Sequence, residues 1–163
     1  YRNIAEKALA KHAIWKVEPE GVYSLDAALG VFDTIIEATG TNTIFAIGKK
    51  VPDHATWPDG IDNIFQALQS VDIGYHLNHF KNGKPMFDPS TGAMVEGIGH
   101  YHYKVEGPRR IVMVCDNPYP SDFDRGLIST FARRYENTAD VERDPTKPTR
   151  LEGADSCTFI VTF

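Results

Sequence analysis

The chain has 163 residues, the size of one ordinary domain, which leaves little room for a second one. Its 42% hydrophobic residues, with nine Phe, seven Tyr and two Trp, are enough for a core and exclude a disordered chain. A net charge of −5 argues against sequence-independent binding of nucleic acid, which requires a basic surface. No apolar run approaches the roughly 18 residues of a membrane span, so we expect a cytoplasmic protein that does not enter a membrane.

Helical periodicity characterises residues 1–80. Apolar residues recur there at steps of three and four. The predicted helices span residues 3–14, 25–39, 43–50 and 62–78. Ser24 is a suitable N-cap for the second helix, and Gly40 ends it. Pro52 and Pro58 interrupt the chain before the fourth helix.

The second half has the pattern of a sheet. Residues 81–91 hold a glycine and two prolines and predict a loop. The predicted strands span 94–105, 111–115, a short segment at Val141, and 157–163, with one helix over 122–135. Helices followed by strands indicate an α+β fold, in which N-terminal helices pack on an antiparallel sheet with one helix inserted between strands. We expect a single domain over 1–163, with its sheet part over 93–163.

Four of the six histidines fall in two pairs, His76-x-x-His79 and His100-x-His102. Residues two apart on a strand project from the same face, and residues three apart on a helix also share a face. A site built from His76, His79, His100 and His102 would suit zinc, iron or copper. The alternative is that both pairs are half-exposed histidines beside a polar loop.

The strand that carries the second pair has two different faces. Tyr101 and Tyr103 lie on one face and the histidines on the other. Either the tyrosines pack inward and the histidines face water, or the histidines line a cavity beneath the helices. Gly97 and Gly99 lack side chains and allow a ligand or another backbone segment to approach closely.

Polar residues are dense at the start of the helix over 122–135. Asp122 and Asp124 have the chemistry of a general acid/base pair. Alternatively, Ser121 and Asp124 form a capping box and the acidic residues complement the helix dipole. Arg125 can pair with either acid or bind a ligand carboxylate.

Cys115 and Cys157 lie in different predicted strands. Two thiols are too few for a disulfide framework or a complete metal site, so we expect reduced, buried cysteines that serve in packing rather than a redox pair. The sequence contains no phosphate-binding glycine loop, no nucleophile elbow and no Cys-x-x-Cys motif. We therefore expect no nucleotide cofactor.

Two segments of the C-terminal half, residues 116–126 and 153–163, resemble the 4-vinyl reductase domain group. This group belongs to the superfamily of haem-NO-binding and Golgi-transport ligand-binding domains, and the resemblance covers residues 93–163. It implies a bacterial α+β domain with a pocket between helices and sheet, which binds a small molecule and forms a homodimer. Members bind phenolic effectors, haem or acyl chains.

The sequence departs from two signatures of that superfamily. The haem branch carries Tyr-x-Ser-x-Arg for the haem carboxylates, whereas Tyr119 and Ser121 are followed here by Phe123. The phenol-sensing branch holds a structural zinc through several cysteines. Cys157 matches the last of them, but Thr149 stands where a second is expected. The resemblance therefore transfers neither the usual haem site nor that zinc site.

Residues and resemblance together predict a non-enzymatic domain that binds or senses a small apolar or aromatic molecule between helices and sheet. The expected ligand-binding residues are Phe65, Tyr75, His76, His79, His100, Tyr101, Tyr103 and Arg125, with Phe32 and Ile36 in the wall. The first alternative is a metal- or haem-dependent enzyme or gas sensor that uses the four histidines. The second is a structural subunit that dimerises and binds no small molecule.

Overall fold

The structure, a computed structural model, describes residues 2–18 and 21–163. Its helices are α1 (Arg2–Lys11), α2 (Leu25–Thr39), α3 (Thr41–Gly48), α4 (Val51–His54), α5 (Ile64–Gln69), α6 (Val71–Leu77), α7 (Ser121–Tyr135) and the 3-10 turn η1 (Arg150–Glu152). Its strands are β1 (Phe80–Lys81), β2 (Lys84–Pro85), β3 (Phe87–Asp88), β4 (Ala93–Met94), β5 (Tyr101–Gly107), β6 (Arg110–Cys115), β7 (Asp140–Arg143) and β8 (Cys157–Thr162).

The main sheet has the strand order β5-β6-β8-β7, and each neighbouring pair is antiparallel. Alternation along β6 sets its buried face, because Ile111, Met113 and Cys115 are fully buried while the residues between them are only partly covered. Met113 lies opposite Phe159 on β8, which is also fully buried. These observations confirm the predicted α+β class with an antiparallel sheet.

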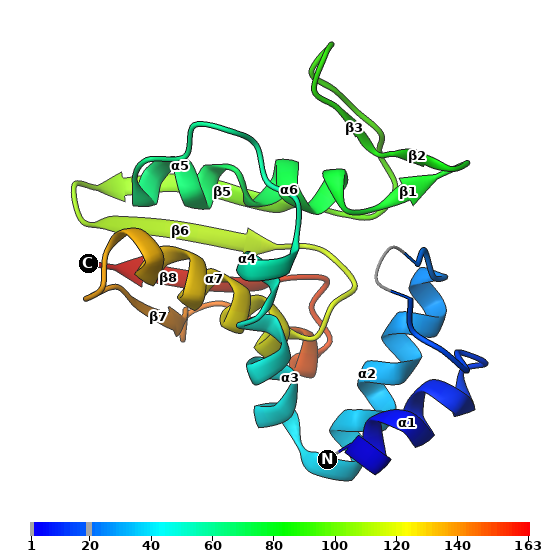
Figure 1. Cartoon of the computed structure of the whole chain (residues 1–163). Coiled ribbons are helices and arrows are strands. Elements are labelled where there is room, and N and C mark those ends of the chain that lie inside the picture. The colour runs from blue at the N-terminus through cyan, green and yellow to red at the C-terminus, as the bar shows by residue number, and fades with distance from the viewer. Residues whose placement is uncertain (1, 19–20) are drawn as a thin grey trace.

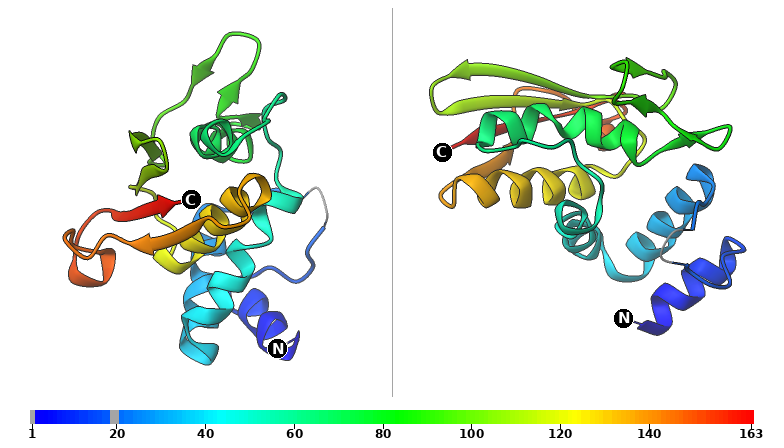
Figure 2. Two further views of the ribbon diagram at one scale, coloured as in Figure 1. Left: turned by 90° about the vertical axis from the view of Figure 1, so that its left-hand side faces the viewer. Right: turned by 45° about the horizontal axis from the view of Figure 1, so that its top comes forward.

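The helices α5, α6 and α7 pack on the same face of this sheet (Figures 1 and 2). The helix α3 packs across α7, and α2 and α1 follow farther from the sheet, at the lower right of Figure 1. Two small hairpins, β1–β2 and β3–β4, extend from the end of α6. Among the described residues, no helix combines the length and the apolar character that crossing a membrane requires.

Several predicted boundaries were wrong for local reasons. The helix expected over 62–78 is two helices, because Asn63 caps α5 and the backbone at Ser70 separates α5 from α6. The strand expected from residue 94 begins at Tyr101, because Gly97 and Gly99 adopt positive φ angles of 120° and 80°. The predicted loop over 81–91 contributes instead to the two hairpins.

The capping box expected at Ser121 is also absent. Pro120 holds the N-cap position of α7 without a side-chain cap. The Ser121 hydroxyl instead contacts the Sγ atom of Cys157 at 2.5 Å. A capping box is present at η1, between Thr149 and Glu152. Cys115 and Cys157 are fully buried and unbonded to each other, as their expected packing role requires.

A buried polar cluster lies at the start of α7. The carboxylate of Asp124, fully buried on α7, accepts hydrogen bonds from Nη1 of Arg150 at 3.0 Å and from the Tyr101 hydroxyl at 2.6 Å. Arg150 also donates from Nη2 to the carbonyl of Cys115. Because the three groups come from α7, η1 and β5–β6, the cluster fixes these elements to one another. Asp124 is thus a structural residue, and Asp122 forms a partly buried ion pair with Arg125.

The crossing of α3 and α7 requires two glycines. A Cβ atom at Gly126 would lie 2.3 Å from the carbonyl oxygen of Phe45, and one at Gly48 would lie 2.1 Å from the carbonyl oxygen of Phe123. Backbone atoms cannot rotate away, so we expect Gly126→Ala to cost about 1–3 kcal/mol of unfolding free energy. Urea unfolding measures this, with Gly107→Ala as the control because its Cβ would meet only an ordinary contact at 3.9 Å. Equal stability of the two variants would contradict the close crossing.

Candidate functional site

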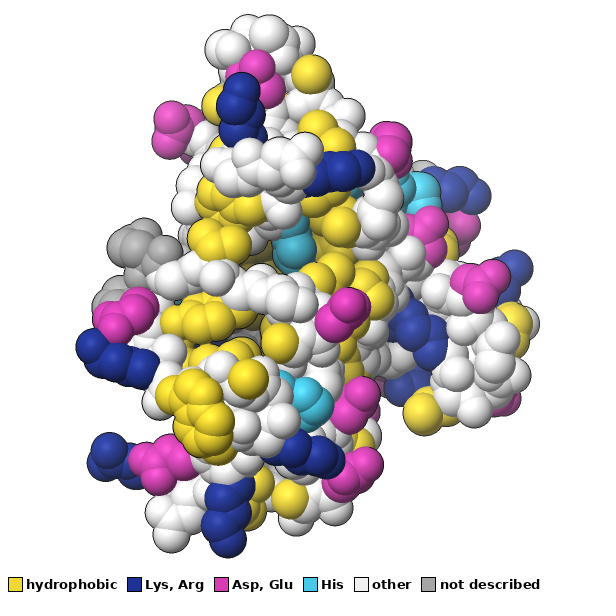
Figure 3. Space-filling model, turned by 90° about the vertical axis from the view of Figure 1, so that its right-hand side faces the viewer, with side chains coloured by type: hydrophobic (Ala, Val, Ile, Leu, Met, Phe, Trp, Pro, Cys, Tyr) yellow, Lys and Arg dark blue, Asp and Glu magenta, His cyan; other side chains and the backbone are white. Residues whose placement is uncertain are grey.

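A cavity of about 200 Å³ lies between α4, α6 and α7 and the start of β5. Its walls are mainly apolar and include Val51, Ala55, Trp57, Val71, Phe123 and Leu127. A second cavity of about 250 Å³ lies against it, toward α2 and the first hairpin. Asn78, His79 and Tyr119 line both cavities and separate them. On the face drawn in Figure 3, hydrophobic side chains gather around a hollow that also holds a histidine.

His79 has a defined protonation state. Its Nδ1 atom lies 2.6 Å from the carbonyl oxygen of Tyr75, which can only accept, so Nδ1 carries the proton. Its Nε2 atom therefore holds an electron pair and accepts a hydrogen bond from the Tyr119 hydroxyl at 2.9 Å. Burial lowers the pKa of His79 below its ordinary value of 6.5 and raises that of Tyr119 to about 12. Both groups are neutral at pH 7.

The other polar side chains of the first cavity already have partners in the protein. Tyr75 donates to the carbonyl of Ile98 at 2.7 Å, and Tyr101 donates to Asp124. The Trp57 ring and the Asn78 amide bond to backbone groups. The His79–Tyr119 hydrogen bond differs because both partners are side chains and each of them lines both cavities. A ligand that displaces this bond would find an acceptor and a donor side by side.

The structure places the predicted ligand-binding residues in three groups. Tyr75, His79 and Tyr101 line the first cavity. His76 and His100 lie in a separate cluster with Asp72. The remaining three residues, Phe65, Tyr103 and Arg125, lie outside these two cavities. Phe65 packs edge-on against Phe163, and Arg125 stacks over Phe45. Tyr103 is partly buried on β5.

The two faces of β5 differ in burial. Tyr101 is 3% exposed and points into the core, whereas His102 is exposed and pairs with Asp116 at 3.0 Å. His100 is partly covered. The histidines of this strand therefore face away from the cavity. Gly99 meets another backbone segment, because a Cβ atom there would lie 2.1 Å from the carbonyl oxygen of Asp116.

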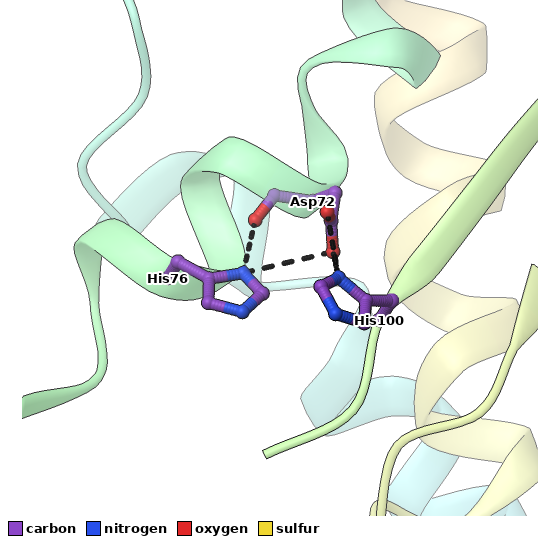
Figure 4. A group of neighbouring side chains, drawn as sticks. All are labelled: Asp72, His76 and His100. Atoms are coloured by element: carbon purple, nitrogen blue, oxygen red, sulfur yellow. Dashed lines mark hydrogen bonds and ion pairs between the residues drawn. The ribbon is translucent and has the colours of Figure 1, made fainter. Parts of the chain in front are cut away.

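The four histidines divide between two places. His79 faces the cavities, while the rings of His76 and His100 face each other beside Asp72, with their centroids 5.0 Å apart (Figure 4). Donor atoms of Asp72, His76 and His100 lie within 4.8 Å of one another. His102 continues this row, with its ring 5.5 Å from that of His100.

Sequence reasoning missed Tyr119 and Trp57. Tyr119 lies in the segment Asn117-Pro118-Tyr119-Pro120 and matches the first residue of the haem signature, yet it was not among the expected ligand-binding residues. An aromatic residue held between two prolines is well suited to a fixed position in a cavity wall, and this was the available signal. Trp57 follows α4 in an irregular segment, where no periodicity indicates the direction of a side chain.

Comparison with solved structures identifies similar folds. An H-NOX protein from S. oneidensis in the Fe(II)NO ligation state is 13% identical with a TM-score of 0.62, over 98% of this chain and 88% of that one. An Fe(II) unliganded mutant H-NOX protein from K. algicida is 13% identical with a TM-score of 0.63, over 98% and 85%. An oxygen-binding H-NOX domain related to soluble guanylate cyclases is 16% identical with a TM-score of 0.59, over 99% and 85%.

The chain therefore has the fold of H-NOX domains over nearly its whole length. No protein-family profile matches it. No curated protein matches its sequence either. The haem-NO-binding part of the predicted resemblance is supported at the level of the fold, and the 4-vinyl reductase part stays a prediction.

Proposed function

We propose that this chain is a sensor domain whose small-molecule ligand binds at His79 and Tyr119, in the two adjoining cavities. One observation carries the proposal: a neutral acceptor and a neutral donor lie side by side between apolar walls. Each cavity is smaller than the roughly 300–1,000 Å³ typical of small-molecule sites. A ligand that displaces the His79–Tyr119 bond would join them into a space of that order.

Haem is the occupant that the fold neighbours suggest. The residues offer a ligand for its iron but no cationic partner for its carboxylates. The Nε2 electron pair of His79 suits an axial ligand of iron. Haem also carries two carboxylates, and among the described residues that line the two cavities none is Lys or Arg. Phe123, which stands where the haem signature has Arg, is itself part of the apolar wall. The site therefore does not fit haem at its carboxylates.

An uncharged ligand fits the lining better. Its apolar part would contact the walls, and its hydroxyl would donate to Nε2 of His79 and accept from Tyr119. These H-NOX structures are 13–16% identical to the chain, so the likeness is one of fold and does not carry their lining residues over to it. We therefore expect an apolar or aromatic molecule with one hydroxyl group, and we keep the haem-based gas sensor as the second candidate because of His79.

The test compares phenol with toluene, which has the same ring without the hydroxyl. We expect His79→Ala to weaken phenol binding about 3–10-fold, the loss of one net hydrogen bond, and to leave toluene binding unchanged. Calorimetric titration measures both affinities, with Tyr103→Phe as the control because Tyr103 lies outside the two cavities. An equal effect of His79→Ala on both ligands, or no effect on either, would contradict the proposed anchor.

Haem is tested in the same protein by titration with hemin. We expect no stoichiometric Soret band, because the carboxylates lack cationic partners. A Soret band that His79→Ala removes would establish the second candidate in place of the first. The phenol affinity should also fall as the pH drops below the pKa of His79, which is itself below 6.5, because protonation of Nε2 removes the acceptor.

A further inference from the structure

A second site is indicated on the other side of α6, where His76 has an unused nitrogen. His76 is fully buried, and its Nδ1 atom donates to the carbonyl oxygen of Asp72 at 2.8 Å. Its Nε2 atom therefore holds an electron pair, and it is buried without a hydrogen-bond partner among the described residues. A buried polar atom of this kind loses its solvation without compensation, so its retention requires an explanation.

His100 is held in the matching orientation by the same aspartate. Its Nδ1 atom lies 3.0 Å from Oδ2 of Asp72, and its Nε2 atom lies 2.8 Å from a carboxylate oxygen of Glu96. Asp72 thus contacts the Nδ1 atoms of both imidazoles, with its carbonyl on one side and its carboxylate on the other. Figure 4 shows the two rings facing each other, with both Nε2 atoms on the side away from Asp72.

We propose that His76 and His100 bind a divalent transition-metal ion of the zinc class through their Nε2 atoms, with Glu96 as the carboxylate ligand and Asp72 as the positioning residue. Zinc prefers this mixture of imidazole and carboxylate ligands. Metal-ligating histidines usually donate their other ring N–H to a carboxylate or a backbone carbonyl, and Asp72 supplies one of each.

The exposure of the three side chains increases from His76 to Glu96, as a site open to solvent on one side requires. The side chain of His76 is 0% exposed, that of His100 is 23% exposed, and that of Glu96 is 75% exposed. The ion can therefore enter from solvent past Glu96, which moves to complete the coordination. The ion takes the position of the proton that His100 shares with Glu96, this proton is released to solvent, and the electron pair of His76 Nε2 completes the pair of imidazole ligands. This site is separate from the cavities of the proposed function.

The experiment is calorimetric titration of the full chain with zinc chloride after treatment with EDTA. We expect one ion per chain, and replacement by Co²⁺ should give the visible absorption of a tetrahedral site. His100→Ala should abolish stoichiometric binding, because it removes one of two imidazoles. Asp72→Asn keeps the backbone carbonyl but weakens the positioning of His100, and should reduce affinity about 10–100-fold.

Two controls make the result specific. His54 is an exposed histidine at the end of α4, and His54→Ala should leave zinc binding unchanged. His79→Ala should also retain zinc, while losing its preference for phenol, which separates this proposal from the first. Thermal melting of each variant checks folding. Absence of saturable binding in the wild type, persistence of binding in His100→Ala, or its loss in His79→Ala would each overturn the site.

Discussion

Arg150→Met should destabilise the protein by about 3–5 kcal/mol at pH 8, because it leaves the buried carboxylate of Asp124 without its counterion. The Asp124 side chain is 0% exposed and that of Arg150 only 17%, so water replaces little of the lost interaction. The substitution also removes the hydrogen bonds of the guanidinium to Ser121 and to the carbonyl of Cys115. Equilibrium unfolding in urea measures the loss.

The penalty should shrink in acid. Burial raises the pKa of Asp124 to about 6, and the charge of Arg150 acts against that rise. A carboxyl group with a raised folded pKa stabilises the fold fully below its unfolded pKa, about 3.9, and loses that contribution as pH rises through the folded value. In Arg150→Met the pKa of Asp124 rises further, so the loss extends to higher pH. The variant should therefore lie closer to wild type at pH 5 than at pH 8.

Arg110→Met is the matched control, because Arg110 pairs with Glu106 at the surface of the sheet. Exposed pairs contribute between about 0 and 1 kcal/mol, so this variant should remain close to wild type at both pH values. If Arg150→Met and Arg110→Met had the same stability, the buried cluster would not be what joins α7, η1 and β5.

Phe131→Ala should cost about 3–5 kcal/mol. Phe131 lies on α7, is 1% exposed, and contacts the ring of Trp57 at a centroid distance of 4.3 Å. Removing the ring leaves a void between α7 and the segment after α4, next to the cavity wall that Trp57 provides.

Leu151→Ala is the control for truncation of a large side chain, since Leu151 is 81% exposed. It should change the free energy of unfolding by no more than about 0.5 kcal/mol. Denaturation followed by tryptophan fluorescence compares the two variants. A small effect of Phe131→Ala would mean that the neighbouring side chains collapse into the void and that the core is less specific than its packing suggests.

The fold was largely predictable because its elements obey local rules. The alternation of Ile111, Met113 and Cys115 and the periodicity of α7 follow directly from burial on one face. The division between α5 and α6 was not predictable, since Leu68, Val71 and Tyr75 continue the apolar periodicity past Ser70, whose backbone stays close to helical at φ −77° and ψ −7°. The late start of β5 depends on Gly99 meeting Asp116, a contact between distant segments.

The candidate site was predictable in its residue types and not in its grouping. The spacing of His76 and His79 places them near each other on a helix, yet His76 lies toward Asp72 and β5 while His79 lies toward Tyr119. Two residues three positions apart differ in direction by about 60°, which is enough to reach different neighbours. Tyr119 is 40 positions from His79 along the chain, and no local pattern connects them.

Because His79 and Tyr119 lie far apart in the chain, a ligand bound between them would act on two distant segments at once. The His79–Tyr119 hydrogen bond joins the end of the helical half to the residue that lies two positions before α7. A molecule bound between the two side chains would move the helical half of the chain and the segment before α7 apart. We expect this displacement to shift the first turn of α7. Since α7 packs against β7, the edge strand of the sheet, the position of that edge would depend on whether the ligand is bound.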